Sequence, residues 1–171
     1  MTEQATATPA AEVDARHDFD FLVGEWTLAN RRLDNPLDDN PTEWQEFEAT
    51  VENRPILGGL GNIDIYTAPE FPGRGRFEGF GLRLFDEGAN VWRIWWASIV
   101  GEGQLDTPVV GGFTDGVGRF ECDDKLGGRE VRVRYEWSDI TPSSAHWEQS
   151  FSVDGGKTFV TNWINQLTRT G

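Results

Sequence analysis

The chain has 171 residues and a mass of 19.2 kDa, the size of one domain, which leaves little room for a second. Lys and Arg total 15 against 29 for Asp and Glu, and a formal net charge of −14 would repel nucleic acid phosphates and anionic membrane surfaces. Hydrophobic residues make up 37% without a long apolar run, so we expect a soluble globular domain with no nucleic-acid or membrane partner.

The start of the chain is predicted to have two parts. Met1–Arg16 is rich in Ala, Thr and Glu and lacks the hydrophobic stretch of a secretory signal, which indicates a disordered N-terminal tail. His17–Gly24 gathers Phe and aliphatic side chains and ends on glycine, which is typical of a short capping turn or helix. We therefore expect one folded domain over residues 17–171, closed at one end by this turn.

From Glu25 onward, apolar residues recur with a period of two, and short turns rich in Gly, Pro, Asn and Asp separate the segments. This pattern predicts an all-β fold of ten antiparallel strands. The predicted strands are Trp26–Leu33, Trp44–Asn53, Leu60–Thr67, Arg76–Phe85, Asn90–Ser98, Thr107–Phe113, Val117–Asp124, Arg129–Asp139, Ala145–Val153 and Thr158–Thr168. A long meander of this kind hides its two edges by closing into a barrel, and about ten strands leave room for an interior cavity.

Alternation along the later strands predicts which side chains line that cavity. Aromatic residues dominate the predicted inner face, and they suit a flat apolar or aromatic ligand that a few amides orient. The predicted ligand-binding residues are Trp92, Trp96, Tyr135, Trp137, Trp147, Gln149, Phe151, Trp163 and Asn165. In the Trp-rich strand, Trp95 is expected on the opposite face, together with Arg93.

Polar residues that alternation sends inward are candidates for chemistry, because a buried polar group needs a partner. The predicted inward polar set is Asn30, Arg32, Glu78, Tyr135, Gln149 and Asn165. Networks that satisfy one another are commoner than catalytic groups, so only Tyr135, Glu78 and Arg32 stand as weak catalytic candidates. Of these, Arg32 is the best partner for an anion and Tyr135 the best proton donor.

The sequence carries no signal for a metal site or a catalytic nucleophile. His17 and His146 are far apart, and no metalloprotease, nucleophile-elbow or Walker motif is present. The single cysteine, Cys122, cannot form an internal disulfide and is predicted to be a buried neutral thiol, which fits a reducing cytoplasm. We expect no metal and no cofactor.

Four segments together resemble an uncharacterised bacterial family of lipocalin-like barrels. They are the FDFLVGEW opening at Phe19–Trp26, the glycine-bearing Gly79–Gly81, the Trp-rich Trp92–Trp96 and the SVDGGKTF hairpin at Ser152–Phe159. Phe159 stands where that family usually has Trp. The resemblance covers nearly everything after the tail, and it implies a calycin-type fold without a settled activity. The hairpin also resembles the Asp box of sialidase-type propellers, but a single copy favours a structural turn.

More distantly, the chain resembles the nitrobindins, ten-stranded barrels that hold heme through a histidine on a late strand. The last predicted strand here has no histidine, and His146 falls on the face opposite Trp147 and Phe151. The resemblance therefore implies a lipocalin- or nitrobindin-like barrel, and heme binding is not expected.

Three functions remain open from the sequence. The first is binding of a small, largely apolar or aromatic metabolite in the barrel cavity. The second is a cofactor-independent enzyme of secondary metabolism, of the cyclase, isomerase or decarboxylase type, acting in the same cavity. The third is a structural or interaction protein, in which a surface patch at Val91 and Trp95 binds a partner or a second copy of the chain to form a homodimer.

Overall fold

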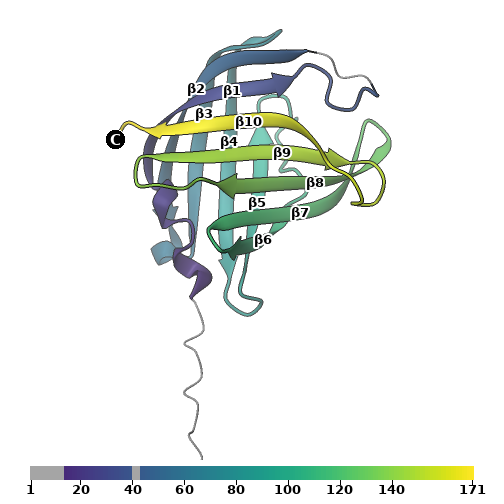
Figure 1. The fold of residues 1–171 in the computed structure, drawn as a ribbon. Coiled ribbons are helices and arrows are strands. Elements are labelled where there is room, and N and C mark those ends of the chain that lie inside the picture. The colour runs from purple at the N-terminus through teal and green to yellow at the C-terminus, as the bar shows by residue number, and fades with distance from the viewer. Residues whose placement is uncertain (1–13, 40–42) are drawn as a thin grey trace, which may run out of the picture.

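The computed structural model describes residues 14–39 and 43–171, which form a closed antiparallel barrel of ten strands (Figure 1). The strands are β1 (Gly24–Leu33), β2 (Trp44–Ile56), β3 (Gly61–Phe71), β4 (Gly75–Asp86), β5 (Val91–Ser98), β6 (Val109–Thr114), β7 (Val117–Leu126), β8 (Arg129–Ser138), β9 (Ser144–Ser152) and β10 (Val160–Arg169). Each strand pairs with its neighbours in the chain, and β1 also pairs with β10, so the barrel has no free edge. The predicted fold class is confirmed.

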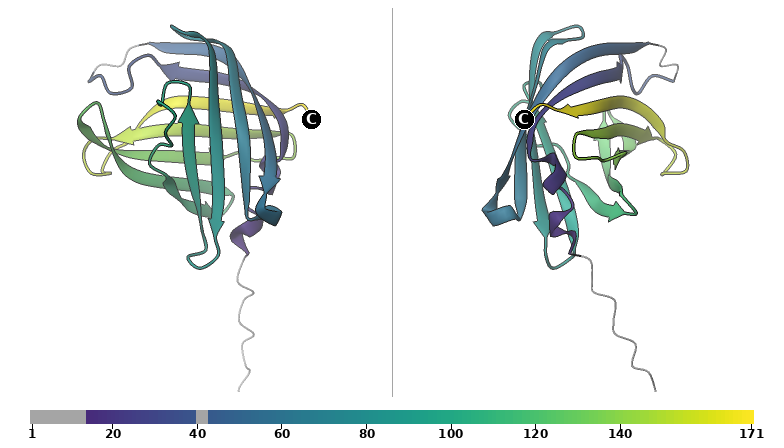
Figure 2. Two further views of the ribbon diagram at one scale, coloured as in Figure 1. Left: turned by 180° about the vertical axis from the view of Figure 1, so that it is seen from behind. Right: turned by 60° about the vertical axis from the view of Figure 1, so that its left-hand side comes forward.

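The barrel is flattened, with two curved layers around its interior. In Figures 1 and 2, β7 to β10 run across one side, while β3 to β5 run steeply along the other. Three 3-10 helices accompany the strands in the described part of the chain: η1 (Ala15–His17), η2 (Asp20–Leu22) and η3 (Leu57–Gly59). Of the predicted tail, residues 1–13 lie outside the described residues, and η1 begins before the predicted boundary at Arg16.

The helical turns η1 and η2 close one end of the barrel. Phe19 is 1% exposed, and its ring meets the edge of Trp92 with centroids 5.1 Å apart. It also packs against Phe120 and Trp137, near the start of β7 and the end of β8. The indole Nε1 of Trp92 donates to the Ala15 carbonyl at 2.8 Å. The predicted capping turn is therefore present, and aromatic packing holds it in place.

The last strand begins later than predicted because a turn uses its first residues. Asp154 accepts hydrogen bonds from the backbone N–H and the hydroxyl of Thr158, at 2.9 and 2.6 Å. These bonds keep Thr158 in the β9–β10 connection, and strand pairing starts only at Val160.

A β-bulge in β10 changes which side chains face inward. Thr161 pairs with Ser150 and Trp163 with Gln149, so Asn162 is an extra residue between two pairs. Asn162 is 1% exposed, and Thr161 bonds to Glu148 on the outer face. A strict period of two would place Thr161 on the inner face with Trp163, and the bulge turns it to the outer face instead.

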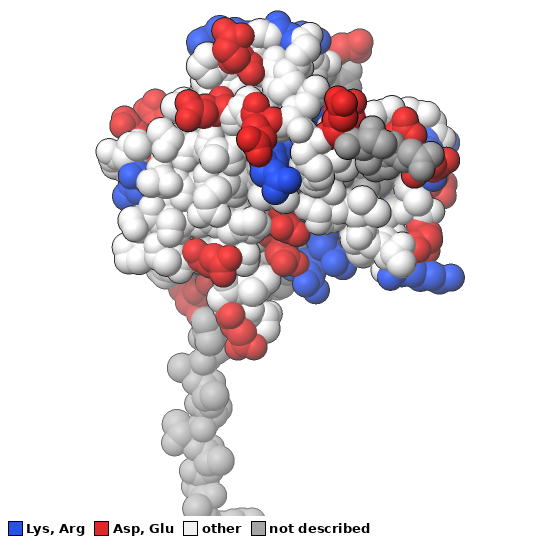
Figure 3. All heavy atoms as spheres, turned by 45° about the horizontal axis from the view of Figure 1, so that its top comes forward, with Lys and Arg blue, Asp and Glu red and all other residues white. Residues whose placement is uncertain are grey.

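The outer face is charged and the inner face is mostly apolar. Cross-strand ion pairs such as Arg119–Glu136 and Arg132–Asp123 join β7 to β8 on the outside. On the face shown in Figure 3, acidic and basic side chains are interspersed. No helix within residues 14–39 and 43–171 is long and apolar enough to cross a membrane.

Candidate functional site

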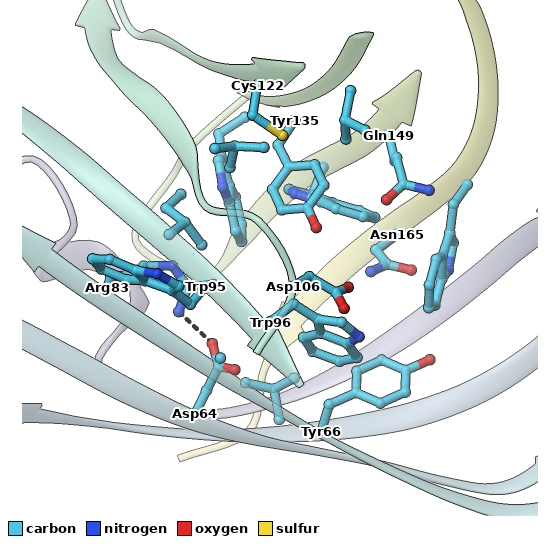
Figure 4. A pocket seen from close by; sticks show the side chains of 18 of the residues that line it. Asp64, Tyr66, Arg83, Trp95, Trp96, Asp106, Cys122, Tyr135, Gln149 and Asn165 are labelled. Carbon is cyan, nitrogen blue, oxygen red and sulfur yellow. Dashed lines mark hydrogen bonds and ion pairs between the residues drawn. The ribbon is translucent and has the colours of Figure 1, made fainter. Parts of the chain in front are cut away.

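A cavity of about 250 Å³ lies inside the barrel, beyond the end closed by η1 and η2 (Figure 4). Its wall is built mainly from inward side chains, and all ten strands contribute to it. The aromatic lining residues are Tyr66, Trp95, Trp96, Tyr135, Trp137, Trp147, Phe151 and Trp163, and the aliphatic ones are Leu22, Leu28, Val51, Ile94, Val109, Leu126, Val133 and Leu167. The polar ones are Asp64, Arg83, Asp106, Thr107, Cys122, Asp124, Gln149 and Asn165.

The structure brings the predicted lining residues to this one cavity, with a single exception. Those that line it are Trp96, Tyr135, Trp137, Trp147, Gln149, Phe151, Trp163 and Asn165. Trp92 does not: it is 1% exposed and packs against Phe19 and Phe85 at the closed end. Trp92 points inward as predicted, but it lies at the start of β5, where it packs at the closed end of the barrel and does not line the cavity.

The three catalytic candidates do not share one site. Tyr135 lines the cavity, and burial first, with Asp106 next, raises the pKa of its phenol well above the usual value. Glu78 points outward: its side chain is 50% exposed and pairs with Arg76, so its predicted interior position is wrong. Arg32 stacks over the rings of Phe71 and Trp163 rather than lining the cavity, and burial lowers its pKa.

Two glycines of β4 make room for lining side chains. A Cβ on Gly79 would lie 2.1 Å from Cη2 of Trp96, so the indole lies directly over the glycine. A Cβ on Gly81 would lie 2.4 Å from Oδ1 of Asp64 on the neighbouring strand. The Gly79–Gly81 pattern of the sequence therefore admits one aromatic ring and one carboxylate to the interior.

The carboxylate of Asp64 forms a buried ion pair with Arg83. Nη1 of Arg83 donates to Oδ2 of Asp64 at 2.5 Å and to Oδ1 of Asn62 at 3.1 Å. The side chains of Arg83 and Asp64 are only 9% and 6% exposed, and both line the cavity (Figure 4). The Arg83 guanidinium also lies 5.3 Å from the ring of Phe19, so the pair sits close to the closed end.

The amides of Asn30 and Gln149, also in the interior, form hydrogen bonds with other side chains of the protein. Oδ1 of Asn30 accepts hydrogen bonds from the Tyr66 hydroxyl at 2.8 Å and from Trp163 Nε1 at 3.0 Å. Gln149 donates through Nε2 to Oδ1 of Asn162 at 2.8 Å, which connects the lining amide to the bulge of β10. These bonds fix the aromatic wall and leave less of Asn30 and Gln149 free for a ligand.

Acidic residues border the cavity away from the closed end. Burial raises the pKa of Asp106, and the nearby Asp124 raises it further. Burial, with Asp124, Asp123 and Asp106 after it, raises the pKa of the Cys122 thiol to about 11, so the thiol is neutral at physiological pH. The carboxylates make this side of the cavity unfavourable for an anion.

The sequence interpretation missed Asp64, Arg83 and Asp106, and it placed Trp95, which lines the cavity, on the opposite face. Phe77 and Phe85, eight residues apart on β4, share the inner face with Arg83 and could have identified it. The outer face of the same strand also carries Phe80, Leu82 and Leu84, so the two faces are hard to tell apart from the sequence. The carboxylates of Asp64 and Asp106 reach the cavity from β3 and from the segment between β5 and β6, and neither position stands out by composition.

Comparison with known proteins shows the fold. The sequence matches no family model and none of the curated proteins. The structure is similar to that of the S-type phycobiliprotein lyase CPES from Guillardia theta, with a TM-score of 0.62 over 94% of each chain. The two chains are 9% identical, so the likeness is one of barrel architecture.

Proposed function

We propose that this protein binds a small, largely apolar or aromatic metabolite inside its barrel. The observation that carries the proposal is the cavity of about 250 Å³ with aromatic walls, inside a barrel whose one end is closed by η1, η2 and the ring of Phe19. An apolar cavity of about 150 Å³ holds benzene, and drug-sized ligands occupy about 300 Å³ or more. The cavity therefore suits a molecule of one or two fused rings.

The likeness to a phycobiliprotein lyase supports a barrel of the lipocalin-like kind, in which an interior binding site is a natural use of the fold. We also propose that the chain belongs with the bacterial lipocalin-like barrels that its FDFLVGEW opening and SVDGGKTF hairpin resemble. The enzymatic alternative has weaker support. Among its candidate residues only Tyr135 lines the cavity, and a phenol with a raised pKa donates a hydrogen bond rather than acting as a base.

Filling the cavity tests this proposal. Val133 is a buried lining residue of β8, and Val133→Phe directs a ring into the space a ligand would occupy. Val110, on β6, is 37% exposed and does not line the cavity, so Val110→Phe is the matched control. With naphthalene as the probe, we expect the wild type and Val110→Phe to gain thermal stability and Val133→Phe to lose at least about tenfold in affinity.

The measurement is isothermal titration calorimetry beside thermal unfolding monitored by tryptophan fluorescence. Circular dichroism establishes that Val133→Phe is folded. Equal naphthalene affinity in the two variants would place the binding site outside the barrel and contradict the proposal.

A further inference from the structure

The buried ion pair of Asp64 and Arg83 is the most unusual feature of the cavity wall. Burying two charges is costly, and apolar residues of similar size usually stabilise a core at least as well. Stability therefore gives little reason for this pair. The strand also keeps glycine at position 81, where any Cβ would collide with the Asp64 carboxylate.

Part of the pair's hydrogen-bonding capacity is unused by the protein. Arg83 donates to described residues only through Nη1, and Asp64 accepts there only through Oδ2. Nη2 of Arg83 and Oδ1 of Asp64 have no partner among the described residues, whereas Nε of Arg83 is buried without one. Because both residues line the cavity, a donor and an acceptor are available there side by side.

The charges around the cavity restrict the kind of molecule that can use this pair. Arg83 is neutralised by Asp64 at 2.5 Å, so the pair offers no net positive charge to an anion. Asp106 and Asp124 border the cavity on the other side and would repel one. The aromatic walls between these groups favour a flat molecule.

Building on the proposed function, we infer that the ligand is an uncharged planar ring system carrying a carbonyl oxygen next to an N–H or O–H group. The carbonyl accepts from Nη2 of Arg83, and the adjacent N–H or O–H donates to Oδ1 of Asp64. A lactam fused to an aromatic ring has this edge. A plain hydrocarbon leaves Nη2 of Arg83 and Oδ1 of Asp64 without a partner, and a carboxylate meets the negative field of Asp106 and Asp124.

Three bicyclic probes of similar size test this inference: naphthalene, 2-quinolinone and 2-naphthoate. For the wild type we expect 2-quinolinone to bind about tenfold or more tightly than the other two, since hydrogen bonds to charged groups are the strong ones. In the double variant Asp64→Leu/Arg83→Met, that preference disappears while naphthalene still binds. The double variant Asp123→Leu/Arg132→Met removes an outer ion pair between β7 and β8 and should keep the preference.

The outcomes separate the two proposals. Equal affinity for naphthalene and 2-quinolinone, or tightest binding of 2-naphthoate, would overturn the inference and leave the binding function standing. If none of the probes binds, the proposed function fails and the inference with it. Should the Asp64/Arg83 variant not fold, infrared spectroscopy of carbonyl-labelled 2-quinolinone on the wild type decides. The inference requires the C=O stretch to fall on binding, relative to its value in a hydrocarbon solvent.

Discussion

At the scale of single residues, glycines in the strands leave the space that some lining side chains occupy. Gly79 lies beneath the Trp96 indole, and its backbone is fixed by pairing with Tyr66 on one side and Ser98 on the other. A methyl group at this position has no free space, so the indole has to move. The position of Trp96 in the cavity wall thus depends on a residue that contributes no side chain.

We expect Gly79→Ala to lower the free energy of unfolding by about 1–3 kcal/mol, the usual cost of overpacking. It should also shift the tryptophan emission, because Trp96 is displaced. Gly112→Ala on β6 is the control, since a Cβ there meets nothing within 4 Å. Urea unfolding followed by fluorescence measures both effects. Equal stability of the two variants would show that Trp96 does not depend on the glycine.

At the scale of elements, the SVDGGKTF hairpin between β9 and β10 is a structural turn organised by one carboxylate. Asp154 accepts from the backbone N–H groups of Lys157 and Thr158 and from the hydroxyls of Ser152 and Thr158. The bonds from Thr158 contribute most to lowering the pKa of Asp154 below its ordinary value. A carboxyl with a lowered pKa stabilises the fold above the pKa of the unfolded chain, and this contribution is lost as the pH falls towards the folded pKa.

Asp154→Ala is therefore expected to lower the urea midpoint at neutral pH. The difference from the wild type should narrow as the pH falls below about 4, where the carboxyl of the unfolded chain becomes protonated. Asp34→Ala, an exposed aspartate whose side chain bonds no described residue, should change the midpoint little at any pH. A difference for Asp154→Ala that stays constant from pH 7 to pH 3 would mean that the hairpin does not use the charge.

Strand patterns explain why some of the site could be predicted and some could not. In β8 the inner residues Val131 to Trp137 alternate with charged ones, so their faces follow directly from the sequence. In β4 both faces carry apolar residues, so alternation does not decide whether Glu78 or Arg83 points inward. The bulge at Asn162 is likewise invisible to a strict period of two. Ion pairs between neighbouring strands, such as Asp64 with Arg83, depend on register, which the sequence leaves open.

At the scale of the whole molecule, one side chain near the end of the chain holds the closed end of the barrel. Arg169, the last residue of β10, donates to the carbonyls of Phe21 and Val23 and, through Nε, to that of Pro142 at 2.9 Å. Its guanidinium lies 4.2 Å from the centre of the buried Trp26 ring. These contacts tie the last strand to the N-terminal turn, whose Leu22 is part of the cavity wall.

Arg169→Met keeps much of the apolar stem but removes the donors, so the carbonyls of Phe21 and Val23 lose their partner. We expect the free energy of unfolding to fall by about 2 kcal/mol, because hydrogen bonds from a charged donor are involved. Amide hydrogen exchange should accelerate in residues 19–23 more than in β7 and β8, since the turn opens locally before the barrel does. Arg119→Met, which breaks only an exposed ion pair with Glu136, should cost at most about 1 kcal/mol and leave exchange in the turn unchanged. Because Leu22 lines the cavity, the affinity for naphthalene should fall in Arg169→Met and not in Arg119→Met. If hydrogen exchange in the turn and naphthalene affinity are unchanged in both variants, aromatic packing around Phe19 closes this end of the barrel without Arg169.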